Sequence, residues 1–367
     1  MSISMKMREF REGKAVIKAP DAQKISREMD VFYNPVMKNN RDFSILLLRA
    51  SGRKLRIADI MAGTGVRSIR FLLETDNVES IYINDYDESS VNIIRENLKL
   101  NKIDNKKVFV SQEEANKFLL SSKGFDYIDI DPFGTPNPFL DSAVKRILAD
   151  GIIAVTATDT SALSGTYENA CKRKYFARPL RNEMMHETGL RILIRKIQLV
   201  GLQYEKALLP VFSFSKDHYF RVFLICKKSK MMCTDIIKKH NYLLYCRNCL
   251  DRKISDYNNE KCSCGNTYDY AGPLWTGDLW DTQLAEKMLR LNTFPDIDRM
   301  LRVIVEESRI NSIGFYDLHK VLPKYKIRLM KTSDIIMKTK SARTHFSDTA
   351  VRSNLAIRDF IEKIKSQ

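Results

Sequence analysis

The stretch Phe125-Asp126-Tyr127-Ile128-Asp129-Ile130-Asp131-Pro132-Phe133-Gly134 decides the predicted fold. Its first six residues alternate in the way that is typical of a buried strand. Pro132 cannot continue a central strand, because proline has no backbone N–H to donate. The strand therefore stops with a carboxylate and an aromatic ring, Asp131 and Phe133, at its carboxyl end. In open α/β sheets this edge is where ligands bind.

Around this stretch, strand and helix patterns alternate along the chain. We predict strands at residues 55–60, 80–84, 108–111, 125–130 and 151–156. We predict helices at residues 41–50, 66–74, 88–100, 116–121 and 139–149. This alternation indicates a parallel sheet with right-handed crossovers, which is a Rossmann-like α/β arrangement. Two further strands, near residues 208–215 and 218–227, are expected to form an antiparallel pair at the end of the sheet.

The ends of the chain and its second half have different patterns. Residues 1–30 suggest a small hairpin or irregular element, and residues 167–201 suggest a long basic helical region. Further helices are predicted at residues 281–291, 295–308, 316–322, 331–340 and 353–365. We therefore expect two domains, a catalytic-type domain at residues 1–230 and a zinc-containing, winged-helix-like α+β domain at residues 231–367.

The charge of the chain points to a polyanionic partner. There are 61 Lys and Arg residues against 45 Asp and Glu residues, a formal net charge of +16. Basic residues are concentrated in residues 172–196 and 320–343, which favours nucleic acid over an evenly solvated surface. No apolar run is long enough to cross a bilayer, and the first residues lack the apolar core of a secretory signal. We therefore expect a cytoplasmic protein with no membrane partner.

A glycine turn follows the first predicted strand. Its sequence is Asp59-x-x-x-Gly63-x-Gly65, and glycines at such a turn allow the backbone to approach a nucleotide closely. The pattern has low specificity, because Ser68 replaces the third glycine of G-x-G-x-x-G, and a turn without ligand remains an alternative. Asp85, at the end of the next strand, can accept hydrogen bonds from ribose hydroxyls. Asp87 is a second candidate for this role.

The third predicted strand is followed by acidic residues that suit the edge of an adenine ring. These are Glu113 and Glu114, which precede Ala115. The alternative is that both carboxylates are ordinary surface charges.

The signature Asp/Asn-Pro-Pro-aromatic at the end of the fourth strand is typical of methyltransferases that act on an exocyclic base nitrogen, and this chain has the form Asp131-Pro132-Phe133-Gly134 there. That nitrogen is a poor nucleophile, because its lone pair is delocalised into the ring. The carboxylate of Asp131 and the carbonyl of Pro132 can accept its N–H groups and favour attack. Phe133 can stack on the base.

Four of the seven cysteines lie close together in the second half of the chain. Cys246-x-x-Cys249 and Cys262-x-Cys264 can supply two thiolate pairs to one tetrahedral zinc ion. Because all four ligands are cysteine, the site is expected to be structural. An iron–sulfur cluster or four unligated thiols are the alternatives.

Four motifs together resemble the tRNA guanine-26 N2-dimethyltransferases of the archaeal type. They are Phe32-Tyr33-Asn34-Pro35, Asn40-Arg41-Asp42, Asp131-Pro132-Phe133-Gly134-Thr135-Pro136 and Ala342-Arg343-Thr344-His345-Phe346. The resemblance covers nearly the whole chain. It implies an S-adenosylmethionine-dependent enzyme that adds one or two methyl groups to N2 of guanine 26 in tRNA.

The resemblance also implies roles for single residues. Asp131 matches the catalytic carboxylate, and Phe32 and Phe133 match aromatics that hold the target guanine between them. Residues implied to contact tRNA or the catalytic cleft are Arg343, His345 and Phe346. Residues implied to bind the cofactor are Arg41, Arg67, Asp85, Glu114 and Ala115, beside Asp59, Gly63 and Gly65 of the glycine turn.

Two other readings of the sequence stay open at this point. The Asp-Pro-aromatic corner alone allows a methyltransferase that acts on another base amine, such as N6 of adenine. A non-catalytic zinc-containing RNA-binding module is the alternative from a different class. A dinucleotide oxidoreductase is disfavoured by Ser68 and by the Asp131–Phe133 corner. We expect the protein to act as a monomer.

Overall fold

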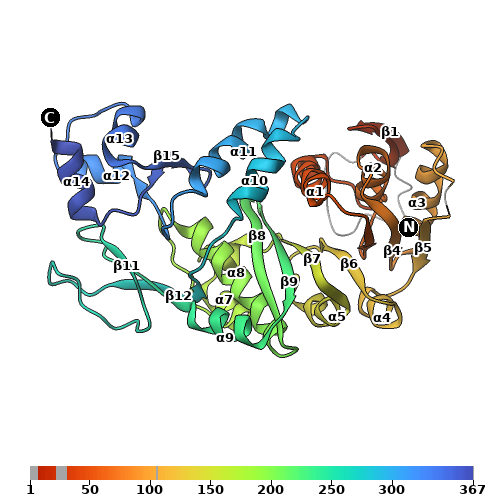
Figure 1. The fold of residues 1–367 in the computed structure, drawn as a ribbon, viewed down its shortest axis with the longest axis horizontal. Helices are drawn as coiled ribbons and strands as arrows, with labels where there is room; N and C mark the ends of the chain where they lie inside the picture. The colour runs from red at the N-terminus through yellow and green to blue at the C-terminus, as the bar shows by residue number, and fades with distance from the viewer. Residues whose placement is uncertain (1–6, 22–30, 105, 367) are drawn as a thin grey trace. The chain divides into compact units, whose positions relative to one another are not determined.

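The computed structural model describes residues 7–21, 31–104 and 106–366. Its largest sheet has seven strands in the order β5-β4-β3-β6-β7-β9-β8 (Figure 1). The strands are β3 (Leu55–Asp59), β4 (Val78–Asp85), β5 (Val108–Gln112), β6 (Phe125–Ile130), β7 (Ile147–Ala157), β8 (Lys206–Lys216) and β9 (Tyr219–Lys228). Strands β3 to β7 pair in parallel, which confirms the predicted parallel sheet.

Helices connect these parallel strands, as the sequence predicts. They are α2 (Val66–Glu74), α3 (Glu88–Leu100), α4 (Ala115–Ser121) and α5 (Leu140–Arg146), with a short 3₁₀ turn at Asn137–Phe139. A 3₁₀ turn at Pro35–Met37 and helix α1 (Lys38–Ser51) precede β3. The bounds of α2 and α3 agree with the prediction. Helix α5 ends earlier than predicted, because the buried Ile147 already pairs with Phe125 as the first residue of β7.

The order of the strands fixes where a ligand can bind. The chain runs from β3 outward to β4 and β5, and it then returns to β6 on the other side of β3. The boundary between β3 and β6 is therefore the switch point of the sheet, where α/β proteins bind their ligands. The register pairs Asp59 with Asp129 across this boundary and Asp85 with Gln112 further out.

A hairpin at the start of the chain confirms the element expected there. It consists of β1 (Met7–Glu12) and β2 (Ala15–Pro20). Two amides of α3 fix it in place: Asn97 accepts a hydrogen bond from the backbone of Lys18 at 2.7 Å, and Asn101 accepts one from Val16 at 2.9 Å.

Arg70 of α2 is fully buried in a network of ion pairs beneath this hairpin. Its guanidinium lies 2.7 Å from Glu74, 2.7 Å from Asp42 and 3.0 Å from Glu12. Burial alone would lower the pKa of Arg70, but the hydrogen bonds and charges of these carboxylates raise it. The ring of Phe294 packs over the guanidinium, 5.5 Å from its carbon. One cation thus joins the hairpin, α1, α2 and a segment from the second half of the chain.

The second half of the chain forms two small sheets, with orders β11-β10-β12 and β13-β15-β14. Their strands are β10 (His240–Tyr245), β11 (Arg252–Ser255), β12 (Asp269–Trp275), β13 (Tyr316–Asp317), β14 (Ala342–Thr344) and β15 (Ser347–Arg352). The helices of this half are α9 (Lys230–Lys238), α10 (Thr282–Arg290), α11 (Pro295–Glu307), α12 (Leu318–Lys324), α13 (Thr332–Thr339) and α14 (Ile357–Lys365). Buried residues of α12, α13, β15 and α14 share one core, which fits the predicted winged-helix-like α+β domain.

Two predicted helices differ from the structure. The region 167–201 is interrupted and gives α7 (Glu168–Tyr175) and α8 (Met185–Leu202), which the short helix α6 (Thr160–Leu163) precedes. Helix α7 stops at Phe176, which has a left-handed conformation, and Pro179 prevents a restart. The helix predicted at 316–322 begins instead with two strand residues, because Tyr316 pairs with Val351 of β15.

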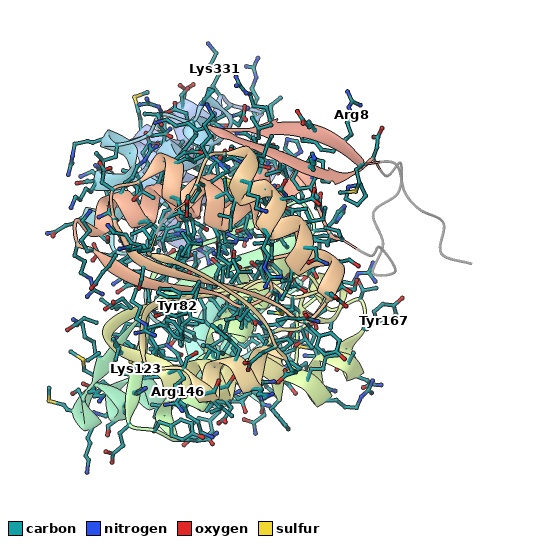
Figure 2. The ribbon with its side chains drawn as sticks, turned by 90° about the vertical axis from the view of Figure 1, so that its right-hand side faces the viewer. Arg8, Tyr82, Lys123, Arg146, Tyr167 and Lys331 are labelled. Atoms are coloured by element: carbon teal, nitrogen blue, oxygen red, sulfur yellow. The ribbon has the colours of Figure 1, made fainter. Side chains whose placement is uncertain are left out.

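By packing, the chain forms two compact units. The first comprises Met1–Thr156, Phe223–Lys227 and Arg290–Ile297, and the second comprises Ala157–Val222, Lys228–Leu289 and Asp298–Gln367. These bounds describe packing, so the functional division predicted after residue 230 stays a prediction. Over the described ranges, every helix is too short or too polar to cross a bilayer. Charged side chains such as those of Arg8 and Lys331 extend outward from the ribbon (Figure 2).

Replacing Arg70 by Ala is expected to lower the free energy of unfolding by about 3–5 kcal/mol, because three buried carboxylates lose their counter-charge. Urea unfolding at pH 7 measures this. Arg302→Ala is the control, since the exposed pair of Arg302 with Asp298 contributes roughly 0–1 kcal/mol. Equal losses in the two variants would contradict the central role of Arg70.

Candidate active site and metal centre

The corner at the end of β6 presents the residues that the sequence marks. Asp129 and Ile130 are buried in the strand, whereas Phe133 is 41% exposed. Gly134 has a φ of +82°, a conformation that glycine adopts without strain, and it completes the turn. The corner therefore leaves Asp131 and Phe133 at the carboxyl edge of the sheet.

Arg67 of α2 lies directly against this corner. Its buried guanidinium forms an ion pair with Asp131 and lies 3.4 Å from a carboxylate oxygen of Asp129. It also donates hydrogen bonds to Asn40 at 3.0 Å and to the hydroxyl of Ser44 at 3.2 Å. The structure thus places Arg67 against Asp131, the predicted catalytic carboxylate, and the predicted contact of Arg67 with the cofactor stays a prediction.

Asp59, at the end of β3, adds a third carboxylate to this cluster. It is buried and accepts a hydrogen bond from the hydroxyl of Ser68 at 2.7 Å. Burial raises the pKa of Asp59 to about 7, although the charge of Arg67 opposes the shift. Burial alone would lower the pKa of Arg67, but the charges of Asp129, Asp131 and Asp59 raise it. Three carboxylates around one guanidinium leave a site that favours a further cation.

The glycine turn has the conformation that its sequence predicts. Gly63 and Gly65 have φ values of +55° and +75°. A Cβ atom at residue 63 would lie 2.7 Å from the carbonyl oxygen of Phe32, so only glycine fits there. The backbone N–H of Gly63 donates to Asp85 at 2.8 Å, which fixes that carboxylate beside the turn.

The two candidates for a ribose contact have different partners. Asp87 accepts a hydrogen bond from the N–H of Ser90 at 2.7 Å and so caps α3. Asp85 is only partly buried, and burial raises its pKa, whereas the N–H of Gly63 opposes the shift. Asp85 is therefore the better candidate to accept hydrogen bonds from a ligand.

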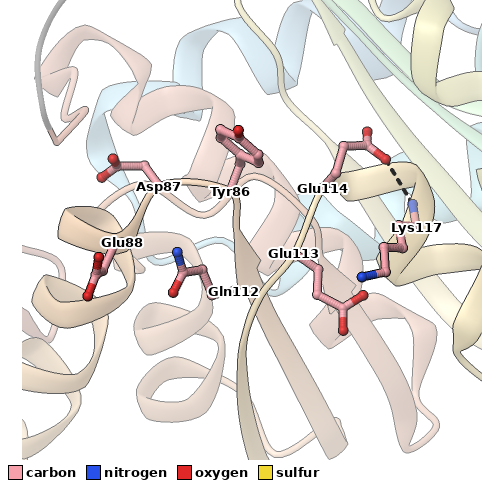
Figure 3. A pocket seen from close by; sticks show the side chains of 7 residues that line it. All are labelled: Tyr86, Asp87, Glu88, Gln112, Glu113, Glu114 and Lys117. Atoms are coloured by element: carbon pink, nitrogen blue, oxygen red, sulfur yellow. Dashed lines mark hydrogen bonds between the residues drawn. The ribbon is translucent and has the colours of Figure 1, made fainter.

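A cavity of about 490 Å³ opens at Tyr86 and Asp87, the two residues that follow Asp85 (Figure 3). It is lined by residues at the ends of β4 and β5 and at the starts of α3 and α4: Tyr86, Asp87, Glu88, Gln112, Glu113, Glu114 and Lys117. One oxygen of Glu113 is buried and has no hydrogen-bond partner among the described residues. Such an orphaned acceptor suits an amino group of a ligand.

Glu114 lines this cavity, but it also caps α4. Its carboxylate accepts hydrogen bonds from the backbone N–H of Lys117 at 2.9 Å and from the side chain of Asn116 at 3.0 Å. Burial alone would raise the pKa of Glu114, but the N–H groups at the start of this helix lower it. Ala115 is buried as the first residue of α4. The sequence alone missed Tyr86 and Gln112, although both stand at strand ends.

Arg41 has a partner that the sequence did not suggest. Its guanidinium forms two hydrogen bonds of 2.6 Å with Glu12, and it donates to the carbonyl of Asn34 at 3.0 Å. Glu12 also accepts a hydrogen bond from the hydroxyl of Tyr33 at 3.1 Å. The side chain of Arg41 is thus buried and paired, so a contact with the cofactor carboxylate would have to displace or share these bonds.

Phe32 and Phe133 are brought together as the resemblance implies. Their ring centroids lie 4.3 Å apart at an interplanar angle of 76°, so the edge of one ring touches the face of the other. The two rings must therefore separate before a base can lie between them. Their role in holding guanine stays a prediction.

The motif Ala342–Phe346 has a different environment from the one expected. The side chain of His345 is buried, and its Nδ1 lies 2.6 Å from Glu307. Phe346 is buried too, with its ring centroid 3.9 Å from that of His345. Only Arg343 of the three predicted contacts is exposed. In this structure, the side chains of His345 and Phe346 are buried, and His345 has a partner, Glu307, that the sequence did not suggest.

The four clustered cysteines fit a metal ion. Their sulfur atoms all lie within 4.8 Å of one another, with Cys246 and Cys264 3.5 Å apart and Cys249 and Cys262 3.3 Å apart. Four sulfurs at bonds of about 2.3 Å around zinc require this kind of spacing. Gly265 has a φ of +88°, which relieves the tight second pair. The residues present therefore fit a structural zinc ion.

Metal analysis of the purified protein is expected to find one zinc per chain and little iron. Cys249→Ser is expected to lose most of that zinc and to lower the melting temperature, because metal binding contributes directly to local folding. Cys233→Ser, a change of a buried cysteine outside the cluster, is the control. Metal-free wild-type protein with an unchanged melting temperature would contradict the assignment.

Comparisons with known proteins show which family the chain belongs to. Residues 13–365 match the family described as N2,N2-dimethylguanosine tRNA methyltransferase. A relative from Aquifex aeolicus, named tRNA (guanine(26)-N(2)/guanine(27)-N(2))-dimethyltransferase, is 40% identical over 98% of this chain and 96% of its own length. A tRNA (guanine(26)-N(2))-dimethyltransferase from Methanothermobacter thermautotrophicus is 37% identical over 96% of this chain and 97% of its own.

A solved structure supports the same family. The complex of Trm1 from Pyrococcus horikoshii with S-adenosyl-L-methionine is 31% identical to this chain. The match has a TM-score of 0.86 and covers 98% of this chain and all of the other. The fold, the order of the motifs and the relatives agree over nearly the full length, and the chain therefore belongs to the N2,N2-dimethylguanosine tRNA methyltransferase family.

Proposed function

We propose that this protein transfers one or two methyl groups from S-adenosylmethionine to N2 of guanine 26 in tRNA. The products are N2-methylguanosine and N2,N2-dimethylguanosine. The observation that carries the proposal is the Asp131–Pro132–Phe133 corner at the switch point of the sheet, together with the cavity of about 490 Å³ at the ends of β4 and β5. The names of the relatives supply the position of the guanine.

The residues around the cavity suit S-adenosylmethionine, whose sulfonium supplies an activated methyl group when the cofactor is bound. Asp85 can accept hydrogen bonds from the ribose, and Glu113 and Glu114 offer acceptors to the adenine amino group. The close glycine turn lets the backbone approach the cofactor. The carboxylate of Asp59 suits the cationic methionine part.

Asp131 performs the chemistry that the site requires. Its carboxylate and the carbonyl of Pro132 accept the N–H groups of the guanine amine, which directs the nitrogen lone pair toward the methyl group. As the N–C bond forms and the S–C bond breaks, Asp131 accepts the proton that N2 loses. Arg67 contributes by fixing the direction of this carboxylate, and orientation supplies much of the rate.

A second round is possible with the same residues. After one transfer, N2 keeps a single N–H, and one carboxylate oxygen of Asp131 is enough to accept it. The rings of Phe32 and Phe133 must then admit a base that already carries a methyl group. Extruding the guanine from the folded tRNA costs a few kcal/mol, and stacking on these rings offsets part of this cost.

The second unit offers basic side chains to the tRNA backbone. Lys324, Lys326, Arg328 and Lys331 lie in or beside α12 and α13, and Arg343 is exposed on β14. Phosphate contacts of this kind position RNA without reading its bases. The monomeric state and the cytoplasmic location stay predictions.

Asp131→Asn is expected to lower kcat by at least about 100-fold, because the amide is a much weaker acceptor for the amine and for its proton. Unmodified tRNA transcripts, followed by mass spectrometry of the nucleosides and mapping of the modified position, measure this. Asp141→Asn, an exposed change on α5, is the control. Methylated adenine, or no methylation by the wild-type protein, would instead support one of the alternatives.

The raised pKa of Asp59 leads us to expect that cofactor binding releases a proton. In the free protein its pKa of about 7 keeps it largely protonated at pH 6, and a cation placed beside it lowers that pKa. Calorimetry in two buffers of different ionisation enthalpy should therefore show proton release at pH 6 but not at pH 8.5, with no release in Asp59→Asn.

The raised pKa of Asp59 also predicts how the stability of the protein changes with pH. Because the folded pKa of Asp59 lies above that of the unfolded chain, near 3.9, the carboxyl costs stability as the pH rises from about 4 to about 7. Asp59→Asn should therefore gain stability relative to the wild type above pH 7. In the calorimetric test of cofactor binding, equal proton release by the wild type and by Asp59→Asn would show that a group other than Asp59 titrates.

A further inference from the structure

Phe176 has a conformation that its side chain disfavours. It ends α7 with a φ of +52°, a left-handed position that glycine usually fills at the end of a helix. For a bulky residue this conformation costs free energy, and no burial compensates, because the side chain is 64% exposed. Strained residues of this kind cluster at binding sites.

Cations surround this exposed ring. The ammonium of Lys196 lies over it, 4.8 Å from the ring centroid, and the guanidinium of Arg195 donates to the carbonyl of Phe176 at 3.4 Å. The Nε atom of Arg195 is buried and has no partner in the described part of the chain. Burial lowers the pKa of both side chains, and the charge of Arg195 adds to the effect on Lys196.

Several basic residues nearby form ion pairs with carboxylates, whereas Arg195 and Lys196 form none in the described part of the chain. Lys172 pairs with Glu168 at 2.6 Å, Lys174 with Asp159 at 3.2 Å and Arg178 with Asp269 at 2.6 Å. In the described residues, no ion pair involves the following cations: Arg173, Arg195 and Lys196. Adjacent, partly desolvated cations without carboxylates favour an anionic ligand.

We propose that Phe176, Arg195 and Lys196 form a contact site for tRNA. Phosphate groups bind the two cations, and an unpaired base stacks on the ring of Phe176, which single-stranded RNA favours. At the start of the same helix, the ring of Tyr167 is 64% exposed and extends from the surface (Figure 2). The proposal rests on the proposed function, which makes tRNA the substrate.

Phe176→Gly separates an RNA contact from a structural role, because the two predict opposite signs. Glycine removes the strain, so the melting temperature should rise. Loss of the stacked base should weaken tRNA binding by about tenfold and raise KM for tRNA with little change in kcat. Phe176→Tyr keeps the ring and should bind like the wild type. A melting temperature that rises while tRNA affinity stays unchanged overturns the proposal.

The cations are tested by the salt dependence of tRNA binding. Each phosphate contact contributes roughly −0.7 to −0.9 to the slope of log K against log salt concentration. Arg195→Gln and Lys196→Gln should each make the slope shallower by about one contact. Lys230→Gln is the matched control, since Lys230 is exposed on α9 and pairs with Glu205.

The wild-type protein decides which proposal is at fault. If it binds and methylates tRNA while all three variants match it in affinity and slope, only the contact site at Phe176 is wrong. If the wild-type protein neither binds nor methylates tRNA, the proposed function fails, and the contact site fails with it.

Discussion

A single buried guanidinium, that of Arg67, sets the geometry of the candidate active site. It lies among the carboxylates of Asp131, Asp129 and Asp59, which two neighbouring parallel strands bring to one edge. Without this cation, the three carboxylates would repel one another, and little bulk water would be close enough to weaken that repulsion. With it, the cluster keeps its shape and remains net negative, which suits a cofactor that carries positive charge.

Buried arginines organise the rest of the molecule in the same way. Arg70 joins three carboxylates in the first unit, and Arg352 joins Glu187 and Glu307 in the second, each within 3.0 Å. Burial alone would raise the pKa of Glu187, yet the charges of Arg352 and Arg191 lower it to about 2. These buried arginines are balanced by the carboxylates around them, so they do not account for the net charge of +16.

Local patterns predicted the elements well, and long-range pairs were the main omission. The bounds of α2, α3 and β6 follow from periodicity, a helix cap and a proline, all of which act within a few residues. The partners Glu12 and Glu307 lie 29 and 38 residues from Arg41 and His345, and no spacing rule links them. The break after α7 was missed because Phe176 is an unusual residue for a left-handed helix end.

The sequence by itself determined the α/β fold, the Asp131–Phe133 corner, the glycine turn, Asp85 and the four cysteines, because each depends on residue types at short spacing. Only the tertiary structure decided which charges compensate one another. It pairs Arg67 with Asp131 and Arg41 with Glu12, and it buries His345 against Glu307. Among the described residues, it places no carboxylate in an ion pair with Arg195 or Lys196. The reason is physical: the energy of a buried charge depends on what the fold places around it, and that is set by packing between distant segments.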